Sequence, residues 1–197
     1  MNVALRTPRP PVPPMTRDEF LAWADVQEER YEFDGVGPVA MTGGSLGHSD
    51  ITGNINRHLR NRLEGMACRA LGPDAGVATV GNAVRYPDAV VTCSKYGRRD
   101  RLVPDPVVVF EVVSRSSVMT DRVEKLREYA AVASIRRYLI VEQVAPAVTV
   151  YSRGGAGEAF TAAGAAGGAV LGLPEIGIEL PLACVYDGIE FDVVQES

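Results

Sequence analysis

Two acidic residues lie in apolar stretches where a carboxylate is costly to bury. Glu111 stands inside the run Val107–Val113, and Asp88 follows Pro87 directly before the run Ala89–Val91. A buried carboxylate needs a partner, because removing it from water without one is expensive. Two acids carried by two apolar strands are typical ligands of a hard divalent cation, which favours Mg²⁺ or Mn²⁺. The pair therefore predicts a metal site.

A lysine beside two converging acids would point to phosphodiester hydrolysis. Asp88 and Glu111 would repel each other unless a cation or a proton lay between them. A metal held there lowers the pKa of a bound water and stabilises the charge that grows on phosphorus. Lys125, on a helix expected after the Glu111 strand, is the candidate that would orient this water or neutralise the leaving charge.

The spacing of apolar residues and turn signals predicts a mixed α/β sheet flanked by helices. The expected helices run from Thr16 to about Asp25, from Ser49 or Asp50 to near Gly65, and from Thr120 or Asp121 onward, the last with a core face of Val123, Leu126, Ala130 and Ala133. The expected strands form hairpins about Asp34-Gly35 and Gly81-Asn82, a strand through Pro87-Asp88 into Val91, a buried strand over 107–113, and a pair over 138–141 and 148–151. The segment 43–47 is expected to be a loop, and the Gly/Ala-rich segment 154–168 is expected to be flexible.

The composition is that of a folded protein with one core. The chain has 197 residues, of which 46% are hydrophobic and 23% charged, and this suits a single domain over residues 16–197. Residues 1–15 are rich in proline, and we expect them to be disordered. The apolar runs fall far short of the ~20 residues that span a bilayer, so no membrane contact is expected. Three scattered cysteines predict free thiols in the reducing cytoplasm.

The net charge of −5 counts against a protein that coats nucleic acid, because phosphate binding usually requires a basic balance. It does not exclude a nuclease, whose acidic site is neutralised by bound cations. Two basic clusters could hold DNA or could be solvated faces. They are Arg57, Arg60 and Arg62, and Lys95, Arg98, Arg99 and Arg101.

A set of motifs follows in order along the chain. They are Glu29-Arg-Tyr-Glu32, His48 after a Gly/Ser loop, Pro87-Asp88, Glu111-Val-Val-Ser-x-Ser-Ser, Asp121-x-x-x-Lys125-x-x-x-Tyr129, an Arg-Arg-Tyr-Leu-Ile-Val strand and a Leu-Gly-Leu-Pro tail. This set resembles the Uma-two family of restriction endonucleases, which belongs to the PD-(D/E)XK nuclease superfamily. The resemblance covers nearly the whole chain after residue 15. It implies a restriction-endonuclease-like core, divalent-metal-dependent cleavage of DNA and frequently a homodimer.

The resemblance also implies roles for the site residues. Asp88 and Glu111 would ligate the metal together with the main-chain carbonyl of Val112. The superfamily pattern has lysine two residues after the second acid, where this chain has Val113, so Lys125 would have to replace it from the neighbouring helix. Glu32 and His48 would complete the site by touching a second metal or the substrate, and Tyr129 would contact phosphate.

Each of these residues has an alternative explanation that involves structure alone. Glu111 could pair with a buried arginine such as Arg85, and Lys125 could pair only with Asp121 on the helix surface. His48 could be a cap or a hydrogen-bonding loop residue. The alternative function is a catalytically silent nuclease-fold protein that acts as a DNA-binding or regulatory module. The valine in the lysine position and the acidic balance favour that alternative.

Overall fold

The structure, a computed structural model, describes residues 13–113 and 119–191, and the side chains of residues 119–121 are not among those described. The helices are α1 (Arg17–Ala24), α2 (Leu46–Arg62), α3 (Met119–Ala131) and α4 (Leu182–Val185), with short 3-10 turns η1 (Val80–Asn82) and η2 (Pro174–Ile176). The strands are β1 (Tyr31–Phe33), β2 (Pro38–Ala40), β3 (Arg69–Leu71), β4 (Val77–Ala78), β5 (Val84–Arg85), β6 (Ala89–Thr92), β7 (Pro106–Val113), β8 (Arg137–Glu142), β9 (Ala147–Ser152), β10 (Thr161–Ala166), β11 (Val170–Leu173) and β12 (Ile178–Pro181).

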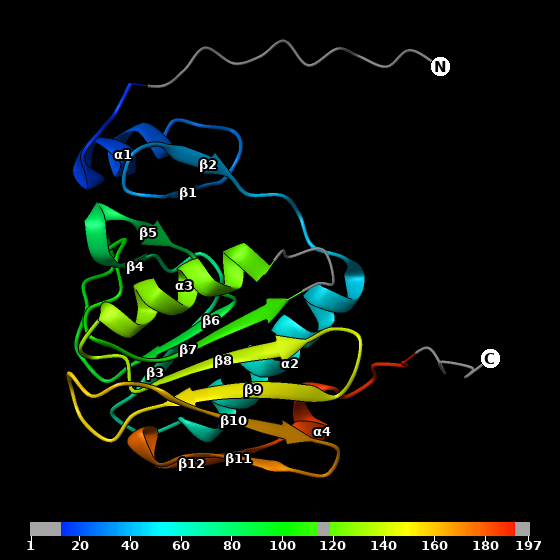
Figure 1. Cartoon of the computed structure of the whole chain (residues 1–197). Coiled ribbons are helices and arrows are strands. Elements are labelled where there is room, and N and C mark those ends of the chain that lie inside the picture. Colours follow the sequence, from blue (N-terminus) through cyan, green and yellow to red (C-terminus); the bar gives the residue numbers. More distant parts are fainter. Residues whose placement is uncertain (1–12, 114–118, 192–197) are drawn as a thin grey trace, which may run out of the picture.

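The strands form three sheets, which Figure 1 shows one above the other. A six-stranded sheet has the order β10-β9-β8-β7-β6-β3, a smaller sheet has the order β2-β1-β5-β4, and β11 pairs with β12. In the six-stranded sheet β7 and β8 are parallel, and the other neighbours are antiparallel. This mixed sheet with helices on its faces confirms the predicted fold class. None of the helices within the described residues is long and apolar enough to cross a membrane.

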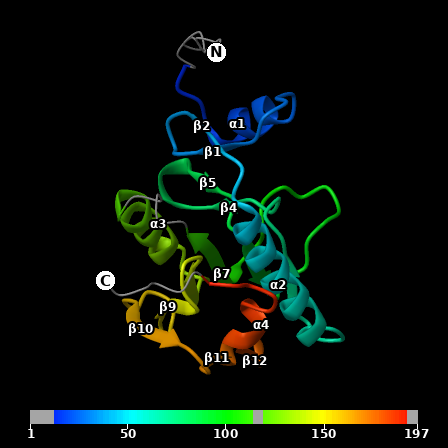
Figure 2. The ribbon, with the colours of Figure 1, turned by 90° about the vertical axis from the view of Figure 1, so that its right-hand side faces the viewer.

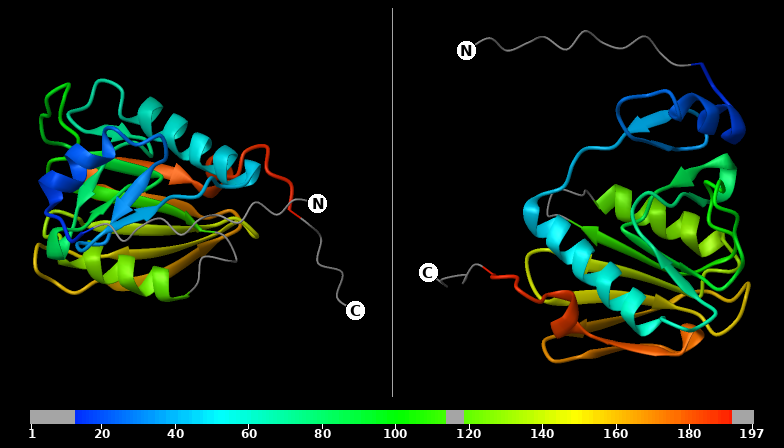
Figure 3. Two further views of the ribbon diagram at one scale, coloured as in Figure 1. Left: turned by 90° about the horizontal axis from the view of Figure 1, so that it is seen from above. Right: turned by 180° about the vertical axis from the view of Figure 1, so that it is seen from behind.

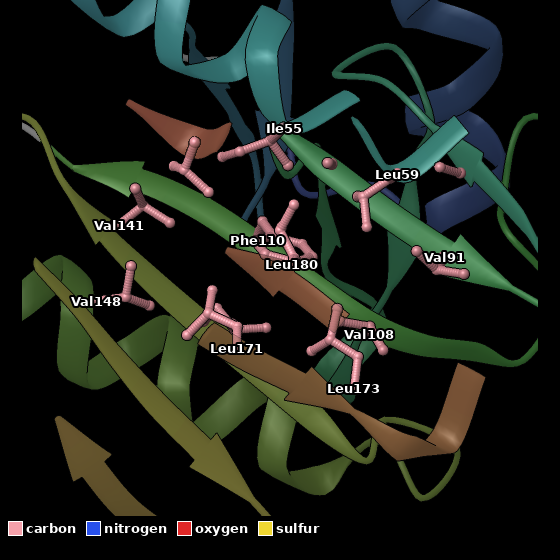
Figure 4. Close-up of a cluster of buried hydrophobic side chains, with 14 of the residues drawn as sticks. Ile55, Leu59, Val91, Val108, Phe110, Val141, Val148, Leu171, Leu173 and Leu180 are labelled. Carbon is pink, nitrogen blue, oxygen red and sulfur yellow. The ribbon is translucent and has the colours of Figure 1, made fainter. Parts of the chain in front are cut away.

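Helices α2 and α3 cover opposite faces of the six-stranded sheet, as the view in Figure 2 shows. On one face, α2, α4 and the β11–β12 pair bury a large apolar cluster (Figure 4). On the other face, Tyr129 of α3 packs with Val109, Val113 and Ile140. A third cluster joins α1 to the smaller sheet, which lies beyond one edge of the large one (Figure 3).

The β7-α3-β8 unit is a crossover between two parallel strands. Glu111 of β7 lies beside Ile140 of β8 in the parallel register, and β7 is buried along most of its length. Side chains on a strand alternate between its faces, so Glu111 shares the α3 face with Val109 and Val113. The sheet therefore presents Glu111 to the helix that carries Lys125.

Helix α2 begins earlier than predicted. Its N-cap is Ser45, whose hydroxyl accepts the main-chain N–H of His48, instead of the expected Ser49 or Asp50. The segment 43–47 is therefore a loop only up to Ser45, and His48 lies in the first turn of the helix. The apolar residues every fourth position located the body of the helix but not its polar first turn.

Two further expectations about the elements were wrong. The Gly/Ala-rich segment 154–168 contains β10, which pairs along its whole length with β9. This edge strand is held by main-chain hydrogen bonds to β9, so its small side chains show no pattern from which a strand could be predicted. Val123 of α3 is exposed, and Ala133 lies beyond the end of the helix, whereas Leu126 packs against the core as predicted. Tyr129, which was not expected on the core face, is buried there. The side chains of Thr120 and Asp121, the expected caps of this helix, are not among those described. Residues 1–12 of the N-terminus that we expect to be disordered also lie outside the described residues.

The chain changes sheets at Pro87-Asp88. The hairpin about Gly81-Asn82 joins β4 to β5 as predicted, with both turn residues at positive φ. The strand does not continue through Pro87, however, because β5 ends at Arg85 in the smaller sheet and β6 begins at Ala89 in the larger one. Asp88 thus lies in a short joint between two sheets.

The expectation of three free thiols was wrong. Cys68 and Cys93 form a disulfide, and Cys184 is free. The physical reason is the antiparallel register of β3 and β6, in which Arg69 lies opposite Thr92. The next residues outward, Cys68 and Cys93, therefore face each other across the pair. The cytoplasmic location inferred from the cysteines stays a prediction.

Removing this disulfide should lower stability. We expect the double variant C68S/C93S to lose about 3–4 kcal/mol of unfolding free energy, because the bond closes a loop of 25 residues in the unfolded chain. Urea denaturation measures the loss, and Cys184→Ser is the control expected to change little. Thiol titration of the denatured protein without reductant should find one thiol per chain; three thiols would show that the bond does not form.

Candidate active site

All of the predicted site residues except Tyr129 line one open cleft of about 1180 Å³. Its walls come from β1, the start of α2, the joint before β6, the end of β7, and α3. Residues from all of these elements take part, and the predicted ones among them are Glu32, His48, Asp88, Glu111, Val112 and Lys125. The fold thus brings together residues that are up to 93 positions apart in the chain, from Glu32 to Lys125.

Glu111 has two partners on helix α3. The Tyr129 hydroxyl donates a hydrogen bond of 2.9 Å to its Oε1 atom, and the Lys125 Nζ atom lies 3.3 Å from both carboxylate oxygens. Burial raises the pKa of Glu111 to about 7, because the charged form is desolvated; the Lys125 charge opposes this rise, and the Asp88 charge adds to it. Arg85, the alternative partner for Glu111, pairs with Glu32 and Glu128 instead.

Asp88 is fixed by three hydrogen bonds around it. Its Oδ2 atom accepts the main-chain N–H of Val112 at 2.7 Å, which ties the joint to the strand of Glu111. Its Oδ1 atom lies 3.2 Å from the Nε2 atom of His48, and its main-chain carbonyl accepts a hydrogen bond of 2.9 Å from the Asn56 side chain. Both His48 and Asn56 belong to α2. The helix therefore holds Asp88 at its carboxylate and at its backbone.

The hydrogen bond to Asp88 raises the pKa of His48 above its ordinary value. Partial burial opposes the rise, while the charges of Asp88 and Glu111 and the main-chain carbonyl of Val112 support it. His48 is therefore more readily protonated than a free histidine. A protonated imidazole beside the carboxylates reduces their mutual repulsion when no metal is bound.

Lys125 reaches into the cleft from α3. Its Nζ atom lies 3.5 Å from Oε1 of Glu32 as well as 3.3 Å from Glu111, and its side chain is 13% exposed. Glu32 comes from β1 and is also buried; its Oε1 atom accepts the main-chain N–H of Tyr86. The ammonium group thus lies between two carboxylates of different sheets.

Tyr129 does not lie where a phosphate contact requires. Its side chain is fully buried, it is absent from the cleft lining, and its hydroxyl is bonded to Glu111. The expected role at the substrate is therefore corrected to that of a support for Glu111. The regular spacing along α3 predicted that Lys125 and Tyr129 share one flank of the helix, but only Lys125 lines the cleft, and Tyr129 is buried in the core.

Sequence reasoning missed a second charged group beneath the site. Glu128, on α3, accepts hydrogen bonds from Arg85 at 2.6 and 2.7 Å and from the Thr79 hydroxyl at 3.1 Å. Arg85 also donates to Glu32 at 3.1 Å. Burial alone would lower the pKa of Arg85, but hydrogen bonding to Glu128 and the charges of Glu128 and Glu32 raise it. A signal existed, since Arg85 stands two residues before Pro87 in an apolar strand.

The donor set fits Mg²⁺ better than a metal held by a full protein cage. Among the described residues there is no group of three or more His, Cys, Asp or Glu side chains arranged around one ion position. Magnesium is usually held by one or two carboxylates, with water and substrate phosphate at its other positions. Asp88 and Glu111 supply two such carboxylates in an open cleft, and the pKa of Glu111 is raised chiefly because burial removes its charged form from water.

The chain is similar to known proteins over most of its length. The model of the Uma2 family, described as "Putative restriction endonuclease", matches residues 17–183. The protein slr1290 of Synechocystis sp. strain PCC 6803 is 30% identical over 188 residues, which are 94% of this chain and 98% of that protein. A crystal structure from Anabaena variabilis, described as "a putative nuclease belonging to DUF820", superposes with a TM-score of 0.67 at 16% identity and covers 87% of this chain and 97% of that one.

The raised pKa of Glu111 gives a testable dependence of stability on pH. Its pKa is about 7 in the folded protein and 4.5 in the unfolded reference, so the folded state binds more protons between these values. The free energy of unfolding of the metal-free protein should therefore fall as pH rises from 4.5 to 7, by on the order of 3 kcal/mol from this group.

Glu111→Gln removes this titration. In EDTA we expect the variant to be more stable than wild type at pH 8 and close to it at pH 4, as measured by urea midpoints. The charge of Glu111 is one of the contributions that raise the pKa of His48, so His48 titrates in both proteins but at a lower pH in the variant. If the variant were less stable than wild type at pH 8, the ion pair between Glu111 and Lys125 would stabilise the fold by more than the burial of the Glu111 charge costs.

Proposed function

The chain belongs to the Uma2 family, whose description and fold are those of a nuclease, and from that premise we propose that it hydrolyses the phosphodiester bonds of DNA as a divalent-metal-dependent endonuclease. The observation that carries the proposal is the position of Lys125. The superfamily pattern expects a lysine two residues after Glu111, where Val113 stands, and the ammonium group of Lys125 lies 3.3 Å from Glu111 instead. The helix thus supplies the cation that the strand lacks.

Asp88, Glu111 and the main-chain carbonyl of Val112 would hold Mg²⁺ or Mn²⁺. When bound, such an ion lowers the pKa of a water molecule and stabilises the charge that develops on phosphorus. The chain holds the two carboxylates in place before any ion binds, since Asp88 is anchored by the Val112 N–H and Glu111 by Tyr129. Anchored ligands need little rearrangement on binding, and this favours affinity and geometry.

Lys125 would orient the attacking water and share the negative charge of the reacting phosphate. Glu32 supports this role, because its Oε1 atom lies 3.5 Å from the ammonium group and gives it a second anionic partner beside Glu111. His48, with its raised pKa, would donate a hydrogen bond toward the carboxylates or toward a phosphate oxygen. Arg30 and Arg122 also line the cleft, paired with Asp74 and Glu142, and would contact phosphates of the substrate. The products would be a phosphate ester and a free hydroxyl at the cleaved bond.

A catalytically silent, DNA-binding or regulatory member of the family is the second candidate. Val113 favours it, because the usual strand lysine is missing, and so does the net charge of −5. A homodimer and a cytoplasmic location stay predictions from the resemblance and the composition. The single domain over residues 16–197 also stays a prediction.

Metal binding should stabilise the wild-type protein through Asp88. At an ion concentration about tenfold above Kd, binding adds about 1.4 kcal/mol to the free energy of unfolding. For a chain of this size that is a rise in Tm of roughly 3–5 °C. Asp88→Ala should abolish the rise in Mg²⁺ and in Mn²⁺, as measured by differential scanning fluorimetry.

The matched control is Asp187→Ala, which removes a solvent-exposed carboxylate paired with Arg57 outside the cleft. This variant should keep the metal response. If wild type and Asp88→Ala respond equally to metal, Asp88 is not a ligand. If neither responds and wild type does not nick plasmid DNA in Mn²⁺, the silent alternative is supported.

Substitution of Lys125 should impair catalysis and leave metal binding intact. We expect Lys125→Met to lower the rate of metal-dependent plasmid nicking by about 10²–10³-fold, the usual cost of losing a group that stabilises transition-state charge. The metal-induced rise in Tm should persist, since Asp88 and Glu111 remain. Nicking assays with supercoiled plasmid under saturating Mn²⁺ measure the rate, and a variant that nicks at the wild-type rate would remove Lys125 from the mechanism.

A further inference from the structure

We propose that Arg85 and Glu128 are positioning residues that hold helix α3 so that Lys125 reaches Glu111. The inference rests on the proposed function for its consequence in catalysis, but the placement of Lys125 that it explains is independent of activity. Nothing in the motifs of the chain assigns a role to this pair.

A catalytic lysine on a helix needs contacts that fix the helix on the sheet, whereas a lysine on the strand of Glu111 would not. A lysine at the position of Val113 would lie on the same face as Glu111, and the hydrogen-bonded register of β7 would fix it there. Lys125 comes from a separate element, so its distance to Glu111 depends on how α3 is seated on the sheet. A shift of about 1 Å at a catalytic group can cost about 10²-fold in rate.

Glu128 lies three residues after Lys125, so both side chains project from the same side of α3, one turn apart. The Glu128 carboxylate receives both arms of the Arg85 guanidinium, at 2.7 Å from Nε and 2.6 Å from the terminal nitrogen. Thr79 donates a third hydrogen bond at 3.1 Å. This two-pronged geometry restricts rotation as well as distance. It fixes the turn of α3 that carries Lys125 against β5.

Arg85 also holds the second carboxylate that contacts Lys125. Its third nitrogen donates to Oε2 of Glu32 at 3.1 Å, while Oε1 of Glu32 lies 3.5 Å from the Lys125 ammonium. One guanidinium thus sets both the helix turn of Lys125 and one of its two anionic partners. Arg85 is 4% exposed and Glu128 is 7% exposed, so solvent screens this arrangement little. The remaining acid near Arg85, Glu124, is exposed and lies 3.5 Å away.

The chain allows the position of Lys125 to be observed directly. It contains only two lysines, Lys125 in the cleft and Lys95 on an exposed loop. In protein labelled with ¹³C at the lysine ε-carbon, a held side chain should show two distinct ε-proton shifts, whereas a freely rotating one averages them. We expect distinct shifts for Lys125 and averaged shifts for Lys95 in the wild-type protein.

Glu128→Gln is the conservative test variant, because it keeps the shape of the side chain and removes its charge. We expect the ε-proton shifts of Lys125 to move toward the averaged pattern of Lys95. The double variant R85M/E128M is the second test, since replacing both members with apolar side chains leaves no unpaired charge between them. It should give the same averaging in a folded protein, as judged by circular dichroism.

The matched control is Glu175→Gln. Glu175 receives the same two-pronged contact from Arg137, at 2.6 and 3.2 Å, and neither residue lines the cleft. Its loss should leave the Lys125 shifts unchanged. Folded Glu128→Gln and R85M/E128M proteins that both keep the wild-type Lys125 shifts would overturn the proposal.

Kinetics then test the consequence. In plasmid nicking we expect Glu128→Gln to lower kcat by about 10–100-fold, with the Mn²⁺ concentration at half-maximal Tm shift unchanged. In the Lys125→Met background the same substitution should have no further effect. An equal effect in both backgrounds would show that Glu128 does not act through Lys125. A wild-type protein that fails to nick DNA refutes the proposed function, while the lysine shifts still decide whether the pair positions Lys125.

Discussion

The burial of several carboxylates in one place is the constraint on which the rest of this structure depends. Glu32, Asp88, Glu111 and Glu128 are each less than 9% exposed. Arg85 and Lys125 supply the opposite charges, with His48 assisting at Asp88. Buried charges are tolerated only when they are paired and hydrogen-bonded. The elements that carry these residues must therefore meet, and their meeting fixes how the smaller sheet, α2 and α3 lie on the six-stranded sheet.

The arrangement divides the acids into two groups with different environments. Glu128 is fully engaged by Arg85 and Thr79 on the inner side, away from the cleft lining. Asp88 and Glu111 face the cleft, and burial raises the pKa of Glu111, with the charges of Asp88 and Glu32 adding to the rise and that of Lys125 opposing it. The inner group gives the site rigidity. The outer group, Asp88 and Glu111, presents two carboxylates to the cleft, and these attract positive charge as a cation-binding site requires.

Much of the fold, and most of the residues that gather in the cleft, could be predicted from the sequence. The alternation and length of apolar runs located β7 and β8, the capping box placed α1 at Thr16, and the turn residues placed the hairpin about Gly81-Asn82. The anomaly of an acid among valines identified Glu111. These signals are local, so a single sequence contains them.

The features that the sequence concealed depend on contacts between distant segments. The partner of Arg85 could not be chosen, since several acids were within plausible reach and only the packing of α3 selects Glu128. Strand β10 depends on the free edge of β9, and the Cys68–Cys93 bond depends on the register of β3 and β6. The burial of Tyr129 depends on how α3 is rotated about its axis on the sheet. The apolar and polar residues of α3 are not separated clearly enough in the sequence to determine that rotation.

The joint between β5 and β6 has a consequence for how the chain can vary. Three residues, 86–88, connect the last residue of one sheet to the first of the next, and Asp88 is one of them. On β6, Val91 packs toward α2 and Val90 toward α3. One residue added or removed here would either displace Asp88 from Val112 and His48 or shift β6 by one position, which would exchange the two faces of the strand. The length of this joint is therefore as tightly constrained as the chemical identity of the acid that it carries.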